Sequence, residues 1–225
     1  MASRKRSKYV SKKPLVPARR APTPRGVAKA EPVRPSVLPK RTSIAGPVPA
    51  DPLKYVRSLV RDIPDFPQPG ILFRDITPIL ADPRAFHITL DAVAERFIGE
   101  HVDAIVAVES RGFIFGGALA ARLNASFVPV RKPGKLPATV DRVSYSLEYG
   151  KGELEMHRDA LRASANVVVV DDLLATGGTA EATAKLAESL GGEIAGLGFV
   201  VELDFLNPRA KLKQYDVFSL LHYDK

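Results

Sequence analysis

The segment VVVVDDLLATGGT, residues 167–179, constrains the fold of this chain more than any other stretch. Its four consecutive valines are not interrupted by a polar residue, which is typical of a strand buried on both faces of a parallel sheet. Two acids, Asp171 and Asp172, end the run, and small residues then lead into the helical pattern TAEATAKLAESL. The segment therefore predicts a strand, an acid pair, a loop and a helix start, which is a building unit of α/β proteins.

The loop between this strand and this helix suits a phosphate group. Gly177 and Gly178 let backbone N–H groups approach an anion, and the helix start adds unpaired N–H donors and a positive dipole end. Thr176 and Thr179 can add hydroxyl donors. The acid pair would repel a bare anion, so ribose hydroxyls or Mg²⁺ are expected beside it. Together these groups indicate a phosphorylated ribose with a metal-bound diphosphate; the alternative is an ordinary strand–turn–helix connection.

Two further segments carry cationic side chains. ESRG, residues 109–112, also follows an apolar strand and precedes a helix, and Arg111 can hold a diphosphate with its planar guanidinium group. The alternative for Arg111 is an exposed position in a turn. Arg131, Lys132 and Lys135 lie within five residues of one another. Such a cluster is usually a solvated loop, but beside two phosphate loops it becomes a candidate contact for the diphosphate.

Strand and helix patterns alternate along most of the chain, which predicts a doubly wound, mostly parallel sheet flanked by helices. We expect a mobile, charged loop at residues 131–144 and a β-hairpin within 145–156. The expected strands are 103–108, 125–130, 167–170, 194–203 and 217–221, and the expected helices are 51–63, one that starts at Asp82, one that ends at Leu123, and 179–190.

Residues 1–50 differ in composition from the rest. They hold 13 Lys/Arg and one acid, Glu31, together with nine of the 19 prolines, whereas the remainder has 20 basic and 24 acidic residues. The net charge of +8 is therefore a property of this segment, which has too few large apolar residues to offset its ordering entropy. We expect a basic, Pro-rich disordered tail at 1–50 and one domain at 51–225. A solvated tail, a nucleic-acid-binding arm and a transit segment all remain open for it.

Five segments resemble, in order, motifs of the adenine phosphoribosyltransferases, a family of the type I phosphoribosyltransferases. They are PDFPQPGILFRDITPIL (64–80), ESRGFIFG (109–116), RKPGKLP (131–137), YSLEYG (145–150) and VVVVDDLLATGGT. The resemblance runs from about Leu53 to the last residue. It implies the type I phosphoribosyltransferase fold, with a small N-terminal hood and a flexible β-hairpin loop. It also implies transfer of the 5-phosphoribosyl group of phosphoribosyl diphosphate to adenine in purine salvage, giving AMP and diphosphate.

The resemblance also assigns expected roles to single residues. Glu148 would manage the proton of the attacking purine, Tyr149 would help to close the loop over the site, and Arg111 would act on the diphosphate. Phosphoribosyl diphosphate would be bound by Asp171, Asp172, Ala175, Thr176, Gly177, Gly178, Thr179, Ser110, Arg111, Arg131, Lys132 and Lys135. Adenine would be contacted by Leu72, Phe73, Arg74 and Leu173, with Leu203 as a further pocket wall. Each of these residues could instead have a purely structural role: a core position for Phe73, an ion pair with Asp75 for Arg74, and an exposed turn position for Glu148.

The same resemblance implies Mg²⁺ as the cofactor, carried by the substrate rather than by a dedicated set of side chains, although Asp171 could ligate it. It implies a homodimer, in which the partner subunit could supply the 131–135 cations. A cytoplasmic location is expected from the sequence itself, which has no cysteine and no apolar secretory-signal region at its N-terminus. The four histidines are scattered without metal-ligand spacing, there is no cysteine, and no apolar run is long enough to span a membrane. Nucleic acid is expected only as a partner of the tail. Two rivals stay open: a ligand sensor of the same fold, and an enzyme for another base such as xanthine.

Overall fold

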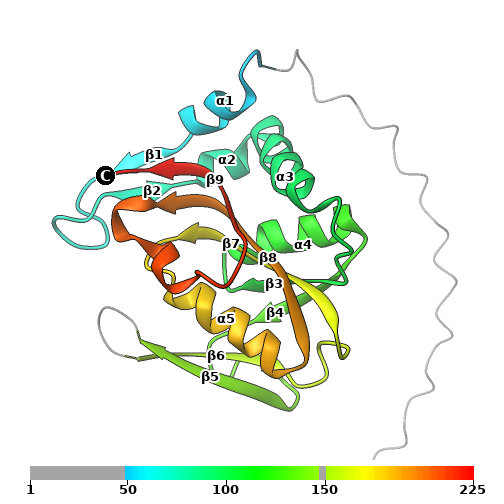
Figure 1. Ribbon diagram of the computed structural model, residues 1–225. Coiled ribbons are helices and arrows are strands. Elements are labelled where there is room, and N and C mark those ends of the chain that lie inside the picture. The colour runs from blue at the N-terminus through cyan, green and yellow to red at the C-terminus, as the bar shows by residue number, and fades with distance from the viewer. Residues whose placement is uncertain (1–48, 147–150) are drawn as a thin grey trace, which may run out of the picture. The chain divides into compact units, whose positions relative to one another are not determined.

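The structure, a computed structural model that describes residues 49–146 and 151–225, is built around a five-stranded parallel sheet (Figure 1). The spatial order of its strands is β4-β3-β7-β8-β9. Their bounds are β3 Ala104–Val108, β4 Ser126–Val130, β7 Ala165–Leu174, β8 Gly192–Leu203 and β9 Val217–Tyr223. The chain passes from β3 outward to β4 and then returns to the other side of β3 as β7, so the direction of winding reverses between β3 and β7.

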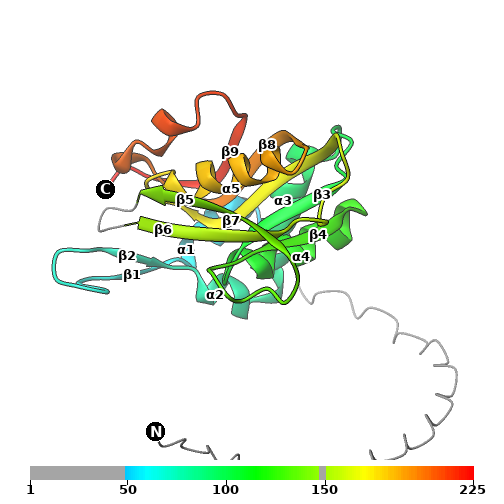
Figure 2. The same ribbon diagram turned by 90° about the horizontal axis from the view of Figure 1, so that it is seen from below.

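Helices cover both faces of this sheet (Figures 1 and 2). α3, Pro83–Phe97, and α4, Gly112–Leu123, lie on one face, whereas α5, Gly178–Ser189, lies on the other. The four-valine run shows why both faces need apolar side chains. Val168 and Val170 pack into the core on the α3 and α4 side, and Val167 and Val169 pack into the core on the α5 side. The predicted doubly wound, mostly parallel sheet is confirmed.

β7 does not end at its last valine, as the sequence predicts, but runs on to Leu174. Asp171, Leu173 and Leu174 continue the parallel pairing with β8. The acid pair therefore belongs to the strand itself, and the backbone of both acids is fixed by the sheet.

The N-terminal part of the described chain packs through α1, Pro52–Ser58, against α3 and β9. α1 ends five residues before the predicted limit at residue 63, because Arg61–Ile63 is strand β1. β1 pairs antiparallel with β2, Phe73–Asp75, and an Arg61–Asp75 ion pair of 2.6 Å ties the two strands. We call α1, β1 and β2 the hood. A short helix that the sequence did not reveal, α2, Thr77–Ala81, follows β2.

An antiparallel hairpin packs beside α5. It consists of β5, Val140–Ser146, and β6, Lys151–His157, so it begins five residues before the predicted hairpin. The second part of the expected mobile loop at 131–144 is therefore a strand. The strand starts before the predicted residue 145 partly because Arg142 forms ion pairs with Glu153 and Glu155 on the opposite strand of the hairpin. Residues 147–150, at the tip of the hairpin, lie outside the described part of the chain.

Two short 3₁₀ helices, η1 (Asp204–Leu206) and η2 (Pro208–Lys211), connect β8 to β9. All described residues belong to one compact unit. The predicted tail lies outside the described residues except for residues 49 and 50. Within residues 49–146 and 151–225, no helix has the length and apolar character needed to cross a membrane.

Candidate active site

A cavity of about 440 Å³ opens where β3 and β7 end, at the point where the winding of the sheet reverses. Ligands of open α/β sheets bind in the crevice at such a position. Many of the residues predicted from the sequence line it: Ser110, Arg111, Lys132, Asp171, Asp172, Leu173, Ala175, Thr176, Gly177 and Thr179. The segments ESRG and VVVVDDLLATGGT, which are about 60 residues apart in the sequence, thus meet in one cavity.

The loop between β7 and α5 offers backbone N–H groups to this cavity. Gly177 precedes α5 with a φ of +78°, a left-handed conformation that glycine adopts without strain. A side chain at this position would also lie 2.6 Å from the backbone oxygen of Pro208. Gly178 begins the helix, and no side chain of the described residues caps its N-terminus. The first N–H groups of α5 are therefore available to an anion.

Asp171 and Asp172 lie next to each other beside this loop. The backbone N–H of Asp172 donates to Asp171 Oδ1 over 2.9 Å, and Arg111 Nε donates to Asp172 Oδ2 over 2.5 Å. Desolvation raises the pKa of the Asp171 carboxyl well above its usual range, and the neighbouring charge of Asp172 raises it further. The start of α4 packs directly against this pair, because a Cβ atom at Gly112 would lie 2.6 Å from Asp171 Oδ1.

Glu109 connects the two cationic segments. Its carboxylate accepts a hydrogen bond from Arg131 Nε at 2.7 Å and another from the backbone N–H of Lys132 at 2.8 Å. Desolvation alone would raise the pKa of Glu109, but the Lys132 amide and the Arg131 guanidinium outweigh it and lower the pKa. Glu155, which is buried, holds the same loop through the backbone N–H of Gly134 at 2.9 Å. Lys132 is thereby placed at the cavity wall, opposite β7.

Arg131 and Lys135 are placed differently from Lys132. The guanidinium group of Arg131 is engaged by Glu109 and donates to the backbone oxygen of Lys135 over 3.2 Å. Neither residue lines the cavity. Their predicted contact with diphosphate would require either a rearrangement of this loop or, as the resemblance implies, another subunit.

The hood reaches the site through Phe73. The guanidinium carbon of Arg111 lies 5.5 Å from the centre of the Phe73 ring, within the range of a cation–π contact. Arg111 thus links Phe73 to Asp172. Leu72 and Arg74 lie elsewhere, in the wall of a second cavity of about 540 Å³. Arg74 pairs with Asp62. The alternative ion pair between Arg74 and Asp75 is not formed, because Asp75 pairs with Arg61.

Several cavity residues were not singled out in the sequence. Tyr145 and Leu154 come from the two strands of the hairpin, and Phe199 comes from β8. Tyr145 could have been predicted as a site residue, because it is the first residue of the motif YSLEYG. Leu154 and Phe199 could not, because the sequence around them is typical of core residues. The predicted Glu148 and Tyr149 lie outside the described residues, and Leu203 ends β8 without lining the cavity.

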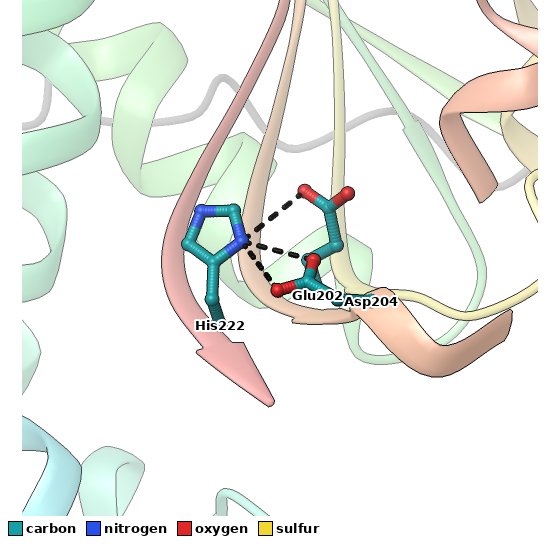
Figure 3. A group of neighbouring side chains, drawn as sticks. All are labelled: Glu202, Asp204 and His222. Carbon is teal, nitrogen blue, oxygen red and sulfur yellow. Dashed lines mark hydrogen bonds and ion pairs between the residues drawn. The ribbon is translucent and has the colours of Figure 1, made fainter. Parts of the chain in front are cut away.

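One group of possible metal ligands stands apart from this cavity. Glu202, Asp204 and His222 converge at the ends of β8 and β9 (Figure 3). Arg209, however, donates to both carboxylate oxygens of Glu202 at 2.8 Å. A positive charge already neutralises the buried carboxylate there, so the arrangement is better described as an ion-pair network than as a metal centre.

Comparison with known proteins identifies the family. Residues 80–221 match the model of the phosphoribosyl transferase domain. The adenine phosphoribosyltransferase of Sorangium cellulosum is 66% identical over 176 residues, which cover 76% of this chain and 88% of that protein. The chain belongs to the adenine phosphoribosyltransferase family.

Other relatives agree with this identification. The adenine phosphoribosyltransferase of Acidobacterium capsulatum is 61% identical over 175 residues, or 78% of this chain and 95% of that protein. The crystal structure of the Thermoanaerobacter pseudethanolicus family member matches with a TM-score of 0.74 and 51% identity, over 76% of this chain and 99% of that chain. The yeast member, from Saccharomyces cerevisiae, crystallised with adenine and an imino-altritol bisphosphate, matches with a TM-score of 0.72 and 42% identity, over 76% and 98% of the two chains. The predicted family and its fold are confirmed.

Proposed function

We propose that this chain transfers the 5-phosphoribosyl group of phosphoribosyl diphosphate to adenine and releases AMP and diphosphate. The observation that carries the proposal is the meeting of two anion-suited loops and an acid pair in one cavity at the reversal point of the sheet. Family membership selects the base, and the yeast relative was crystallised with adenine and a bisphosphate together.

The loop from Ala175 to Thr179 would hold the 5′-phosphate. Its glycine backbone approaches closely, and the start of α5 supplies N–H donors and a positive dipole end. The acid pair next to it would accept hydrogen bonds from the ribose hydroxyls. With both contacts made, the C1 atom of the sugar would face the ESRG loop and Lys132, which line the same cavity.

Arg111 would exchange partners when the substrate binds. In the structure its Nε donates to Asp172. When ribose hydroxyls donate hydrogen bonds to Asp172, they can replace the one from Arg111. The guanidinium group of Arg111 is then free to bind the diphosphate. Ser110 and Lys132, which line the same wall, would complete this anion site.

The transfer itself breaks the bond from C1 to a diphosphate oxygen and forms a bond from C1 to a purine nitrogen. Positive charge develops on the sugar, as at other glycosyl centres. Arg111 and Lys132 would stabilise the negative charge on the leaving diphosphate. Glu148 would accept the proton that the purine nitrogen loses, and Tyr149 would help to exclude water from C1. Phe73 would stack on the purine and Leu173 would be a further contact, whereas Leu72 and Arg74, which line the second cavity, would reach the purine only if the hood moved.

The carboxylate oxygens of the acid pair are suitable ligands for Mg²⁺. Two carboxylates lie side by side, and desolvation together with the charge of Asp172 disfavours the ionised form of Asp171, a situation that a divalent cation would relieve. When bound with the substrate, Mg²⁺ would neutralise charge on the diphosphate. Asp171 is the side chain most suited to contact it.

We also propose a homodimer in the cytoplasm. β4 is the edge strand of the sheet, and two large apolar side chains, Phe127 on β4 and Ile114 on α4, are 37% and 44% exposed. A partner covering this side would bury them and could bring its own 131–135 segment to the site. Light scattering measures the mass of the particle; a monomer at micromolar concentration would contradict the dimer.

The proposed location in the cytoplasm follows from the phosphorylated substrate.

The decisive assay measures diphosphate release from phosphoribosyl diphosphate with adenine, guanine, hypoxanthine or xanthine, alone and in competition. We expect release with adenine and little with the others. Release with xanthine but not adenine would identify an enzyme for another base. Binding of phosphoribosyl diphosphate without turnover of any base would identify a sensor of the same fold.

A further inference from the structure

The end of β9 joins the hood to the sheet. The ring of Tyr223 lies against two guanidinium groups of the hood, with the guanidinium carbons of Arg57 and Arg74 at 5.0 and 4.2 Å from the ring centre. The backbone adds two further links. Arg57 Nη1 donates to the backbone oxygen of His222 over 2.9 Å, and Arg74 Nη2 donates to that of Lys225. α1 and β2 therefore bind the same short stretch of chain.

That stretch is itself fixed to the sheet. His222 and Tyr223 pair in parallel with Glu202 and Leu203 of β8. The His222 side chain makes a further contact, because its Nδ1 lies 3.0 Å from Asp204 Oδ1 just beyond the end of β8 (Figure 3). The end of β9 is thus held by β8, and the hood is attached to it through Arg57 and Arg74.

The position of Arg74 also fixes its neighbour Phe73, since both belong to the three-residue strand β2. Phe73 faces Arg111, which lines the main cavity. The side chain of Arg74 is only 8% exposed, so its contact with the Tyr223 ring is largely shielded from water, which strengthens a cation–π interaction.

We propose that Tyr223 is a positioning residue that sets Phe73 of β2 through the cations of Arg57 and Arg74. This inference rests on the proposed function, in which Phe73 stacks on adenine. Tyr223 does not line the main cavity, so it acts through Arg74 rather than on the substrate itself. Its removal should therefore weaken the use of adenine while leaving the sugar-phosphate contacts on β7 and α5 intact.

The test compares Tyr223→Leu with Tyr223→Phe in the full-length chain. Leucine keeps apolar bulk and removes the aromatic face, whereas phenylalanine keeps the face and removes only the hydroxyl group. Tyr215→Leu is the matched control, because Tyr215 is also half-buried near the C-terminal end of the chain but bonds to Glu188 of α5 and not to the hood. Three quantities are measured: the KM for adenine, the Kd for phosphoribosyl diphosphate by calorimetry, and hydrogen exchange of residues 61–75.

We expect Tyr223→Leu to raise the KM for adenine about five- to tenfold and to speed exchange in the hood, because two cation–π contacts are lost. The Kd for phosphoribosyl diphosphate should stay within about twofold, and Tyr223→Phe should restore both properties. An unchanged KM for adenine, an equal loss of phosphoribosyl diphosphate affinity, or the same effect from Tyr215→Leu would overturn the inference. If the unaltered chain did not use adenine at all, the proposed function would fail, and faster exchange in the hood alone would then leave Tyr223 as a structural support only.

Discussion

Asp171 experiences both desolvation and the charge of Asp172, which together raise the pKa of its carboxyl. The folded protein therefore favours the neutral acid. The contribution of this group to folding stability is present at low pH and is lost as the pH rises through the raised pKa. A substrate that donates hydroxyl groups, or a cation, would instead favour the charged form. Ionised Asp171 therefore lowers the stability of the fold at neutral pH, which is common for carboxylates at functional sites.

Asp171→Asn should make the ligand-free protein more stable at neutral pH, because the amide mimics the neutral acid. Each unit by which the fold raises this pKa corresponds to about 1.4 kcal/mol. The advantage over the unaltered chain should shrink as the pH falls toward about 4, where the unfolded acid is also protonated. Urea unfolding with a chelator present, at pH 4.5 and pH 7.5, measures this difference. A variant that is less stable at pH 7.5 would show that the ionised form is the one favoured by the fold.

Glu148→Ala should lower kcat by about 100-fold or more, as expected for removal of a proton acceptor. The Kd for phosphoribosyl diphosphate should change little, since the groups proposed to bind it lie on β7, α5 and the ESRG loop. Steady-state rates combined with calorimetry separate the two effects. Equal losses in kcat and in affinity would make Glu148 a binding residue.

At the scale of elements, the ion pair between Glu202 of β8 and Arg209 of η2 stabilises the connection that leads to β9. Glu202 is 1% exposed. Desolvation would raise its pKa, but the hydrogen bonds and charge of Arg209 outweigh this and lower it. The stability that the pair contributes is therefore present above the unfolded pKa of about 4.3 and is lost as the pH falls through the lower folded value.

Arg209→Ala should destabilise the fold by about 2–3 kcal/mol, because it leaves a buried carboxylate without its partner; the full loss is reduced because Arg209 is half-exposed. Arg158→Ala, which breaks the more exposed pair with Asp141, is the control and should cost much less. Urea unfolding at pH 7 provides both values. Equal effects of the two substitutions would contradict a special role for the buried pair.

The elements that the sequence predicts well are those with a strong local pattern. The four-valine run and DAIVAV specify strands because both faces of the sheet are buried, and Asp82 marks the start of α3 because its carboxylate accepts the N–H of Ala85. The limits of α1 and the early start of the hairpin depend instead on partners far away in the sequence. β1 exists because it pairs with β2, and no local pattern in Arg61–Ile63 reveals that pairing.

The site divides in the same way. Loop residues such as Arg111, Thr176 and Gly177 could be predicted, because each follows a buried strand and strand ends of a parallel sheet meet at one edge. Two other features could not be predicted from the sequence: the ion pair between Arg131 and Glu109, and the contacts of Tyr223 with the hood. Both depend on side-chain contacts between segments that no spacing rule connects.

At the scale of the whole molecule, the basic residues 1–50 precede the residues that form the site. Removal of residues 1–50 should leave kcat/KM for adenine within about twofold, because the core found among the described residues begins at Val56 and Asp51 still caps α1 through the N–H of Lys54. Rates of the full-length and shortened chains at matched concentration test this. A large loss of activity would show that the segment belongs to the catalytic unit, and a loss of nucleic-acid binding alone would assign it to a separate task.

The most direct test of the account is a crystal structure of the chain with AMP bound. We expect the phosphate on the backbone amides of Ala175–Thr179, the ribose hydroxyls on Asp171 and Asp172, and the purine ring against Phe73. A nucleotide bound away from the ends of β3 and β7, with solvent alone beside the acid pair, would contradict it.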